Sequence, residues 1–416
     1  MFWLTENDIK QNLLSLPNVC FEVTEKCNLA CTYCVYRELY NDHDIRNNTD
    51  MPISMAQAVL DYLASIWNSK DISRYNNETT ISFYGGEPLL NISFIKEIVK
   101  YTSLMHTCRI FHFAITTNAL LLPKYIDFFV KNQFRILISL DGDYDGSAHR
   151  INNDGKNSFP IVFDNIKYVQ KQYPKYFKEN VSFNSVLSNV NDVGQINAFI
   201  YKEFGKHPYI SPINPRGVDV KEYDRFKAIY KHFSNLSHEI LHPEDITETS
   251  VYDNPNIKDV FRYIVRMSGN HFESYQDLLN CNSCYDSSLV CPGTCSPFSR
   301  KLFVTAKGRI LQCERIGHHF SIGNIHSNVV HLDFNAIVEQ YNGLIRKMLP
   351  VCSQCTSRPL CFKCIYQIKD ITTDSPICNK VSYTKESLFK EIRRIKSFLI
   401  DHPTIYTQLI ETIHIK

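Results

Sequence analysis

The sequence lacks the features of membrane-bound, secreted and nucleic-acid-binding proteins. No apolar run approaches the roughly 20 residues that a membrane-spanning helix needs. Residues 1–10 carry Glu6 and Asp8 and no apolar core segment, which excludes a secretory signal peptide. The net charge is only +2, so nothing indicates a polyanionic partner such as nucleic acid. We therefore expect a cytoplasmic protein that binds neither nucleic acid nor a membrane.

Cysteine, by contrast, is abundant, with 15 residues in a chain of 416. Disulfides are rare in a reducing compartment, so metal binding explains this number better. Only Cys20 and Cys108 stand apart from the rest, and we expect them to be buried, unreactive thiols. The other cysteines fall into groups at 27–34, 281–295, 313 and 352–378.

The first half of the chain alternates between short apolar runs and segments with helical periodicity. The pattern predicts strands at 19–24, 79–84, 110–116, 134–139 and 181–187. It predicts helices at 52–67, 94–101, 124–131, 159–172 and 193–204. Such alternation indicates an α/β fold with a parallel sheet, here a partial (β/α)6 barrel. In a parallel barrel, the loops that follow the strands gather at one end and form the active site.

The composition changes in the second half, and we expect three parts at 1–220, 221–290 and 291–416. The first is the partial barrel. Residues 221–290 are polar, predict helices and carry no recognisable chemistry, so they would act as a bridge. The third part is rich in cysteine. It contains a predicted hairpin at 301–312, a helix at 333–348 and a final helix with Leu388, Ile392, Ile395 and Leu399 on one face.

Cys27, Cys31 and Cys34 form a CxxxCxxC motif directly after the first predicted strand. Three thiolates at this spacing suit a [4Fe–4S] cube and leave its fourth iron open to a small molecule. Zinc is the alternative, although zinc prefers four ligands and shorter CxxC pairs. The motif resembles that of the radical S-adenosylmethionine (SAM) superfamily. The resemblance implies that the open iron binds the amino and carboxylate groups of SAM.

A glycine motif one βα unit later strengthens this resemblance. Gly85-Gly86-Glu87-Pro88 follows the second predicted strand and is similar to the family motif that holds the methionyl amino group of SAM. The two glycines, which lack Cβ atoms, would let a ligand lie against the backbone. Glu87 would then receive the cation. By the same resemblance, Tyr33 matches a position that contacts adenine.

Other strand ends also resemble the SAM site of the family. Ser139 and Asp141 match the motif for the SAM ribose and carboxylate. Arg150 matches an arginine that contacts SAM, although the stretch before it is one residue shorter here and lacks the usual His-Asp pair. Asn118, which follows the third strand, either contacts SAM or stabilises its own turn.

The C-terminal cysteines resemble the SPASM extension of radical SAM enzymes, which implies two auxiliary [4Fe–4S] clusters. The first would use Cys295, Cys313, Cys364 and one upstream residue, either Cys291 or else Cys281 or Cys284. The second would use Cys352, Cys355, Cys361 and Cys378. The gap between Cys361 and Cys364 and the gap between Cys364 and Cys378 are both shorter than in relatives. A pair of zinc sites is the alternative to the two iron–sulfur clusters. With the N-terminal motif, the total would be three clusters.

The resemblance implies that the reduced cluster cleaves SAM to methionine and a 5′-deoxyadenosyl radical, which removes a hydrogen atom from the substrate. A flavodoxin or ferredoxin would donate the electron. We predict a peptide maturase that forms a thioether or carbon–carbon cross-link in a ribosomally made precursor peptide. The alternative is an anaerobic sulfatase-maturing enzyme that converts cysteine or serine to formylglycine. A non-catalytic electron carrier would explain the cysteines but not the glycine motif.

Glu314 bears on this choice because sulfatase-maturing relatives usually place an aspartate base after the corresponding cysteine. Cys313-Glu314-Arg315 is more typical of peptide maturases. We predict that Glu314 accepts a proton from the substrate while a neighbouring cluster accepts the electron. Pairing with Arg315 or another cation is the alternative. Only eighteen residues precede the first strand, so we expect the barrel, the bridge or another protein to bind a leader peptide.

Overall fold

The computed structural model describes residues 3–69, 77–231, 294–355, 361, 363–378, 385–401 and 403. The chain forms two compact units. The barrel unit comprises Thr5–His238 and Ser296–Ile337. The second unit comprises Met1–Leu4, Glu239–Cys295 and Val338–Lys416. No helix in the described ranges is long and apolar enough to cross a membrane.

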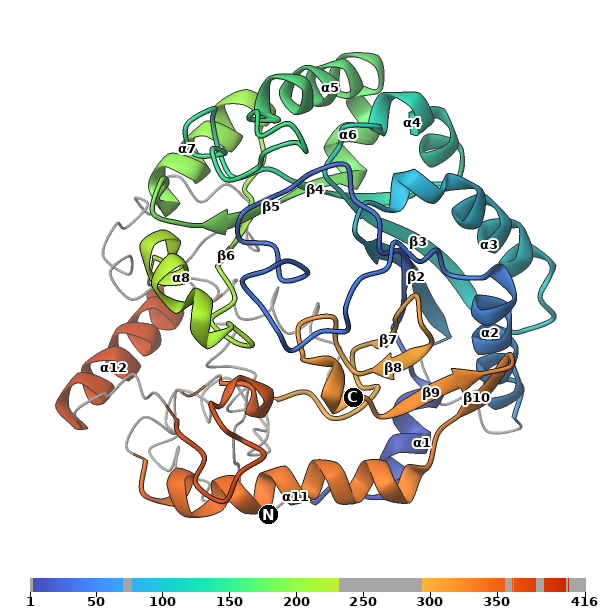
Figure 1. Ribbon diagram of the computed structural model, residues 1–416, viewed down its shortest axis with the longest axis vertical. Helices are drawn as coiled ribbons and strands as arrows, with labels where there is room; N and C mark the ends of the chain where they lie inside the picture. The colour runs from blue at the N-terminus through green and yellow to red at the C-terminus, as the bar shows by residue number, and fades with distance from the viewer. Residues whose placement is uncertain are drawn as a thin grey trace. The chain divides into compact units, whose positions relative to one another are not determined.

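The barrel unit is built on one sheet of ten strands in the order β10-β9-β8-β7-β1-β2-β3-β4-β5-β6. Strands β1 to β6 are parallel, and each pairs with the next in chain order. They are β1 (Asn18–Thr24), β2 (Glu78–Gly85), β3 (Ile110–Thr117), β4 (Arg135–Ser139), β5 (Val181–Leu187) and β6 (Tyr209–Pro212). Figure 1 shows these strands curving into an arc with helices on the outside. The predicted α/β partial barrel is confirmed.

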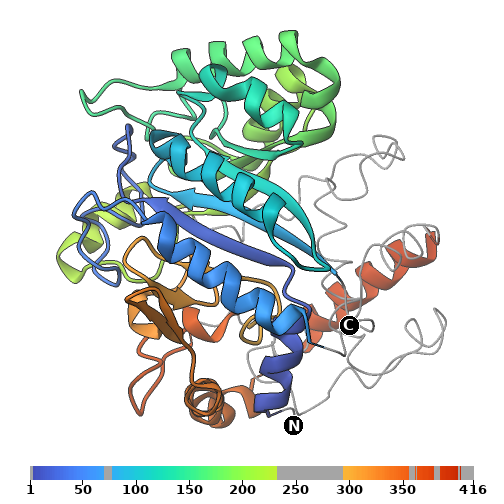
Figure 2. The same ribbon diagram turned by 90° about the vertical axis from the view of Figure 1, so that its right-hand side faces the viewer.

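Amphipathic helices cover the outer face of the parallel strands (Figure 2). They are α2 (Ile53–Trp67), α3 (Ile92–Leu104), α4 (Leu122–Lys131), α5 (Phe159–Gln172) and α7 (Val193–Phe204). Helix α2 shows the pattern, because its buried residues Val59, Leu63 and Trp67 recur at helical spacing. The sequence pattern did not indicate α1 (Glu6–Leu14), α6 (Pro174–Asn180) or strand β6, all of which are short.

Phenylalanine rings stack on one another in the core between the sheet and these helices. Phe134 stacks on Phe113 at 5.2 Å and on Phe83 at 5.9 Å between ring centroids. Phe183 and Phe204 stack at 4.9 Å further along the sheet. Such close-packed interiors deform little, so the ends of the strands are held in fixed positions.

Residues after the predicted bridge extend the sheet beyond β1. Strand β7 (Leu302–Val304) pairs parallel with β1, and β8 (Arg309–Leu311) returns antiparallel to it, which confirms the predicted hairpin. Strands β9 (Gly323–His326) and β10 (Val329–His331) complete the edge. The barrel unit therefore includes Ser296–Ile337, which the sequence assigned to the third part of the chain.

The remaining described elements are short or lie towards the C-terminus. They are η2 (Pro88–Asn91), η3 (Val220–Glu222), α8 (Tyr223–Ile229), η6 (His318–Phe320), α11 (Phe334–Ser353), η8 (Ile365–Gln367) and α12 (Lys385–Asp401). Three of the four predicted apolar residues of α12 are buried, namely Ile392, Ile395 and Leu399. The side chain of the fourth, Leu388, lies outside the described set. Most of the predicted bridge at 221–290 also falls on residues that the structure does not describe.

Candidate functional site

The CxxxCxxC motif lies in the segment that joins β1 to α2. We call residues 25–50 the cysteine loop. Figure 1 shows this loop, in blue, lying across the middle of the arc of strands. The Cys34 amide donates to the Cys31 carbonyl at 3.2 Å, which folds the second half of the motif into a turn. The motif therefore follows the carboxyl end of a barrel strand, where active sites of parallel barrels form.

Gly85 and Gly86 pack directly against the backbone of the cysteine loop and the strand before it. A Cβ atom on Gly86 would lie 2.0 Å from the Lys26 carbonyl oxygen, and one on Gly85 would lie 2.5 Å from the Thr24 carbonyl oxygen. The Gly86 amide donates to Thr24 at 2.9 Å. We predicted that the glycines leave room for a ligand. In the structure, the backbone of the chain itself fills the space beside them.

Glu87 is a buried carboxylate that is held by neutral donors. It is 1% exposed and caps the short helix η2, whose first residue is Pro88. The Thr117 hydroxyl donates to it at 2.7 Å, and the Asn118 amide at 2.8 Å. Burial raises the pKa of Glu87 to about 7, although these hydrogen bonds oppose the rise. Among the described residues no cation pairs with this carboxylate, so it can still accept one.

Asn118 connects the third strand end to the cysteine loop. Its side-chain amide donates to Asn28 at 2.8 Å, and its side-chain oxygen accepts from the Leu120 amide at 3.1 Å. Asn118 therefore stabilises its own turn, which was one of its predicted roles. It also contacts Asn28, the residue that follows Cys27.

Asp141 is also buried, at 1% exposure, but it is already paired with a cation. Arg150 approaches both of its oxygens, with Nε 3.0 Å from Oδ2 and Nη2 donating to Oδ1 at 3.1 Å. The Tyr33 hydroxyl donates to Oδ2, and the Val186 amide donates to Oδ1 at 2.9 Å. Burial would lower the pKa of Arg150, but Asp141 outweighs burial and raises it. These residues connect the third cysteine of the motif to β4 and β5, whereas Ser139 ends β4 half-buried.

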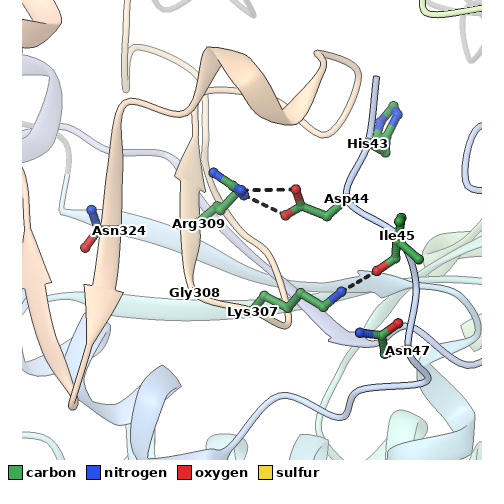
Figure 3. Close-up of a pocket in the computed structure, with 8 residues that line it drawn as sticks. All are labelled: His43, Asp44, Ile45, Asn47, Lys307, Gly308, Arg309 and Asn324. Carbon is green, nitrogen blue, oxygen red and sulfur yellow. Dashed lines mark hydrogen bonds and ion pairs between the residues drawn. The ribbon is translucent and has the colours of Figure 1, made fainter. Parts of the chain in front are cut away.

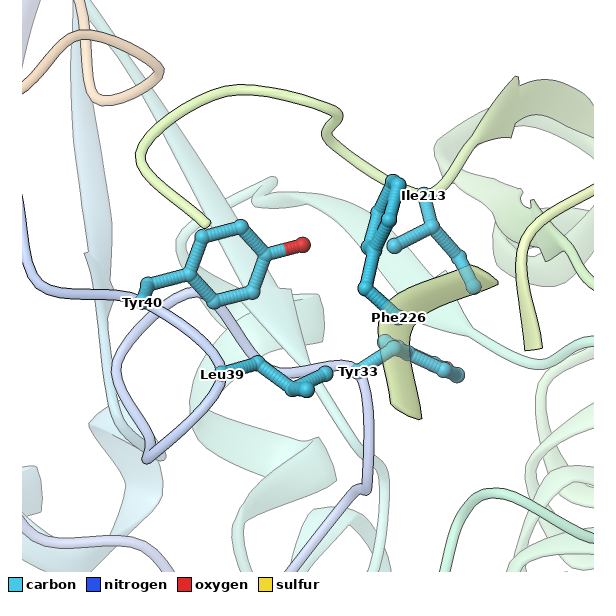
Figure 4. Close-up of a cluster of buried hydrophobic side chains, with 5 residues drawn as sticks. All are labelled: Tyr33, Leu39, Tyr40, Ile213 and Phe226. Carbon is cyan, nitrogen blue, oxygen red and sulfur yellow. The ribbon is translucent and has the colours of Figure 1, made fainter. Parts of the chain in front are cut away.

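A small cluster of apolar side chains packs the cysteine loop against the segment that follows β6. Tyr33, Leu39 and Tyr40 from the loop pack with Ile213 and Phe226 from the segment after β6, as Figure 4 shows. The Tyr40 hydroxyl also donates to the Asn214 carbonyl at 2.8 Å. Burial of these rings contributes stability in proportion to the apolar area removed from water.

Glu314 forms an ion pair with Lys301 at 2.7 Å rather than with Arg315. Burial alone would raise the pKa of Glu314, but the Lys301 ammonium outweighs it and holds this pKa below its usual range. The Glu314 carboxylate lies 3.6 Å from the sulfur of Cys313. Burial, followed by the charge of Glu314, raises the pKa of Cys313 to about 12. In the structure Glu314 is therefore paired with a cation, which was the alternative to its predicted role as a proton acceptor.

A hollow of about 670 Å³ lies between the cysteine loop and the β7–β8 hairpin. Figure 3 shows the residues that line it. Its lining residues are His43, Asp44, Ile45, Asn47, Lys307, Gly308, Arg309 and Asn324. Arg309 binds Asp44 through two nitrogens, at 2.6 and 3.1 Å, and Lys307 lies 3.1 Å from Glu25. Because both cations of the hollow are already neutralised, these contacts mainly attach the loop to the hairpin.

The three thiols of the motif suit a metal cluster. Burial raises the pKa of Cys27 to about 11 and that of Cys31 to about 12, and charge on Cys34 adds to both shifts. Thiolates, which are the form that binds iron, are therefore costly here unless a positive centre compensates them. In the described ranges no three His, Cys, Asp or Glu side chains converge on a single metal ion. A [4Fe–4S] cube instead takes its cysteines on different irons, so the donor set fits this group.

The other predicted ligands fall into different parts of the structure. Cys313 belongs to the barrel unit. The second unit contains the half-buried residues Cys295, Cys352, Cys355, Cys361, Cys364 and Cys378. Cys281, Cys284 and Cys291 lie outside the described residues. The cysteine ligands assigned to the two auxiliary clusters therefore remain predictions.

Several charged residues beside the site, namely Glu22, Arg46 and Lys301, were not predicted from the sequence. Glu22 is a charge inside an otherwise apolar strand, and such a residue normally needs a buried partner. Its partner is Arg46, at 2.5 Å. Lys301 could also have been found, because the predicted hairpin places it across from Cys313 and Glu314. No pattern in the sequence indicated Arg46, which lies in an irregular segment.

Part of this chain is similar in sequence to proteins of one known superfamily. The model of the radical SAM superfamily matches residues 21–193. A radical SAM cyclopropyl synthase, TigE, from Paramaledivibacter caminithermalis is 27% identical over 230 residues, which are 48% of this chain and 45% of that protein. A cysteine-type anaerobic sulfatase-maturating enzyme from Clostridium novyi is 26% identical over 231 residues, covering 51% and 58%. The chain thus spans about half the length of these relatives.

A solved structure has a similar fold over almost the whole chain. It is native anSMEcpe with bound AdoMet, with a TM-score of 0.55 and 17% identity, covering 94% of this chain and 99% of that one. The same protein with AdoMet and the Kp18Cys peptide gives a TM-score of 0.53. At this identity the likeness shows a shared fold and nothing further.

The close approach of Gly86 to the cysteine loop gives a first prediction. Gly86→Ala should lower the stability of the protein by about 3 kcal/mol, because the new Cβ would overlap backbone atoms that cannot rotate away. The urea midpoint of unfolding measures the effect. Gly343→Ala is the matched control, since Gly343 has no atoms within 4 Å of its Cβ position. Equal stability of the two variants would contradict the packing described above.

Proposed function

Because the chain belongs to the radical SAM superfamily through residues 21–193, we propose that it is a radical SAM enzyme that modifies a peptide. Membership in this superfamily implies a [4Fe–4S] cluster and SAM. We assign the cluster to Cys27, Cys31 and Cys34. When bound, the reduced cluster supplies the electron that cleaves SAM to methionine and a 5′-deoxyadenosyl radical. The reaction on the peptide is the formation of a thioether or carbon–carbon cross-link.

The proposed SAM site is supported by a difference between two buried carboxylates in the charge of their partners. Asp141 has Arg150 as its cation, whereas the donors that reach Glu87 are neutral. A buried carboxylate without a cation is costly in its charged form, and an ammonium group would relieve that cost. Glu87 therefore receives the methionyl ammonium of SAM. Its anchors on Thr117 and Asn118 fix the carboxylate in place before the ligand arrives.

The remaining predicted SAM contacts have two tasks in this proposal. Tyr33, Asp141 and Arg150 bind one another, so their first task is to hold the cysteine loop against the strand ends. Their second task follows from the family resemblance, by which Tyr33 would contact the adenine of SAM and Ser139, with Asp141, its ribose and carboxylate. Asn118 positions Asn28, which follows Cys27 directly. These residues orient the ligand and exclude water, which is what a radical reaction needs from the protein.

Glu314 is the proposed proton acceptor in the modification of the peptide. Lys301 keeps this carboxylate ionised, so it can accept a proton, although its lowered pKa makes it a weaker base than an isolated glutamate. Forming a thioether from a thiol and a carbon radical requires the loss of one proton and one further electron. Cys313, next to Glu314, is assigned to an auxiliary cluster that would take the electron.

A second candidate is a sulfatase-maturing enzyme that makes formylglycine. The likeness of this chain to anSMEcpe over 94% of its length favours this candidate in fold. The cyclopropyl synthase is similar to the chain to the same extent as the sulfatase-maturating relative. Glutamate at position 314, where such enzymes usually have aspartate, leads us to prefer another modification. The two auxiliary clusters, the flavodoxin or ferredoxin donor, the precursor peptide and the cytoplasmic location belong to the proposal as well.

Iron content and SAM cleavage test the proposed cluster. Anaerobically reconstituted protein should hold about twelve irons, because three cubes carry four each. Replacing Cys27, Cys31 and Cys34 together by alanine should remove about four of these irons and all formation of 5′-deoxyadenosine. Cys20 is buried as predicted, whereas Cys108 is exposed, so that prediction was wrong for Cys108. Cys108→Ala is the control and should keep both the irons and the formation of 5′-deoxyadenosine. Continued SAM cleavage in the triple variant would remove the basis of the proposal.

The pKa of Glu87 predicts how SAM binding depends on pH. Below a pH of about 7, a proton occupies the Glu87 carboxylate and competes with the methionyl ammonium of SAM. The Kd for SAM should therefore rise as the pH falls. Glu87→Gln should weaken binding at least tenfold, since a charge-assisted hydrogen bond contributes roughly 1.5–3 kcal/mol, and should abolish this pH dependence. Titration calorimetry checks both. Exposed Glu97 supplies the control Glu97→Gln, and wild-type behaviour of Glu87→Gln would make Glu87 purely structural.

The proton acceptor can be tested with the genuine peptide substrate. Glu314→Gln keeps a hydrogen bond to Lys301 but cannot take up a proton. We expect 5′-deoxyadenosine to form normally while the modified peptide decreases roughly a hundredfold, the scale of losing a general base. Mass spectrometry of the peptide gives the yield. A normal yield would show that Glu314 only pairs with Lys301.

A further inference from the structure

Arg46 makes three contacts that bracket the cysteine motif. Its Nη2 lies 2.5 Å from the Glu22 carboxylate, and its Nη1 donates to the Glu25 carbonyl at 2.9 Å. Its guanidinium carbon lies 3.4 Å from the centre of the Tyr36 ring. Glu25 precedes Cys27 by two residues and Tyr36 follows Cys34 by two. One guanidinium therefore touches the segments on both sides of the three cysteines.

Glu22 connects this arginine to the rest of the sheet. The carboxylate lies on β1 and is 2% exposed, and its second oxygen accepts from the Ala306 amide in the β7–β8 turn at 2.9 Å. The Arg46 side chain is 16% exposed. Charges so far from water interact with their surroundings more strongly than surface charges do.

The pair also lies within electrostatic reach of the thiols. Burial raises the pKa of Cys27, and the charge of Arg46 opposes part of that rise. Burial alone would lower the pKa of Arg46, but Glu22 first, and then charge on Tyr36 and Cys34, raise it. Lys307 pairs with Glu25 and Lys26 with Asp50, whereas the Glu87 carboxylate has no cation and, after burial, adds to the rise in the pKa of Cys27. Arg46 and Glu22 are thus a balanced buried pair beside the proposed ligands.

We propose that Arg46 and Glu22 position the cysteine loop and set the reduction potential of the cluster that Cys27, Cys31 and Cys34 hold. The inference rests on the proposed function only in that these cysteines bind the cluster. On reduction the cluster gains one electron from the external donor, and no bond forms or breaks. A nearby cation stabilises the reduced, more negative state, and a nearby anion destabilises it. Removing either partner leaves the other uncompensated.

The two charges can be removed separately, and their effects should be opposite. Glu22→Gln keeps the shape and hydrogen-bonding ability of the side chain and leaves Arg46 as a lone cation. We expect reduction to become about tenfold more favourable, a shift of about +59 mV for a one-electron couple. Arg46→Gln leaves Glu22 as a lone anion and should shift the potential by a similar amount in the negative direction. Arg46→Lys retains the charge and should stay near the wild type.

The measurement is a redox titration followed by electron paramagnetic resonance of the signal that changes when SAM is added. Arg309→Gln is the matched control, because the Arg309–Asp44 pair also joins the cysteine loop to the β7–β8 hairpin, although Arg309 is 44% exposed. It should leave the potential unchanged. Shifts of the same sign in Glu22→Gln and Arg46→Gln, or no shift in Glu22→Gln, would overturn the inference.

Loss of the cluster itself is also informative. If Arg46→Gln loses about four irons while Arg46→Lys retains them, the positioning half of the inference holds and Glu22→Gln decides the electrostatic half. If both arginine variants keep the cluster and the wild-type potential, the inference fails while the proposed function stands. Failure of the proposed function looks different, because wild-type protein would then show no signal that responds to SAM.

Discussion

The cysteine loop has no helix or strand between β1 and α2, so its shape depends on contacts with other parts of the barrel unit. Those contacts reach almost every strand end. Gly86 supports the loop backbone, Asn118 holds Asn28, and Asp141 binds the Tyr33 hydroxyl. The β7–β8 hairpin completes the ring through Glu25 and Asp44. Three cysteines on an otherwise irregular segment can form one site because the folded barrel fixes that segment from all sides.

Buried charge decides which of these contacts support the fold and which remain open to a ligand. Asp141 and Glu22 each have an arginine partner, and Glu314 has a lysine. Breaking such buried pairs is strongly destabilising, because it leaves a charge without compensation. Glu87 differs from these three carboxylates in having only neutral donors. A cationic ligand would complete its environment, as arginine or lysine completes the others.

The sequence predicted the architecture of the parallel sheet well. Alternating apolar runs located five of the six parallel strands, and residues of the CxxxCxxC and glycine motifs followed two of them. The runs at 301–304 and 309–312, on either side of the turn at Ala306-Lys307-Gly308, correctly indicated a hairpin. Strand β6 was missed because four residues with a half-exposed pattern and a final proline give little periodicity.

The partners within the site could not be predicted in the same way. Asp141 and Arg150 were both expected to contact SAM, whereas the structure pairs them with each other. The need for glycine at position 86 arises from the Lys26 carbonyl, 60 residues earlier in the chain. Arg46 meets Glu22 and Tyr36 only because the loop folds back on β1. Such pairings depend on chain crossings in space, which residue spacing does not record.

The central claim is that SAM binds the open iron of a cluster on the cysteine loop. Electron–nuclear double resonance of reduced protein with SAM, isotopically labelled at the methionyl amino nitrogen, tests it most directly. The account predicts a hyperfine coupling between that nitrogen and the cluster. A reduced cluster that forms on Cys27, Cys31 and Cys34 but shows no such coupling at saturating SAM would contradict it.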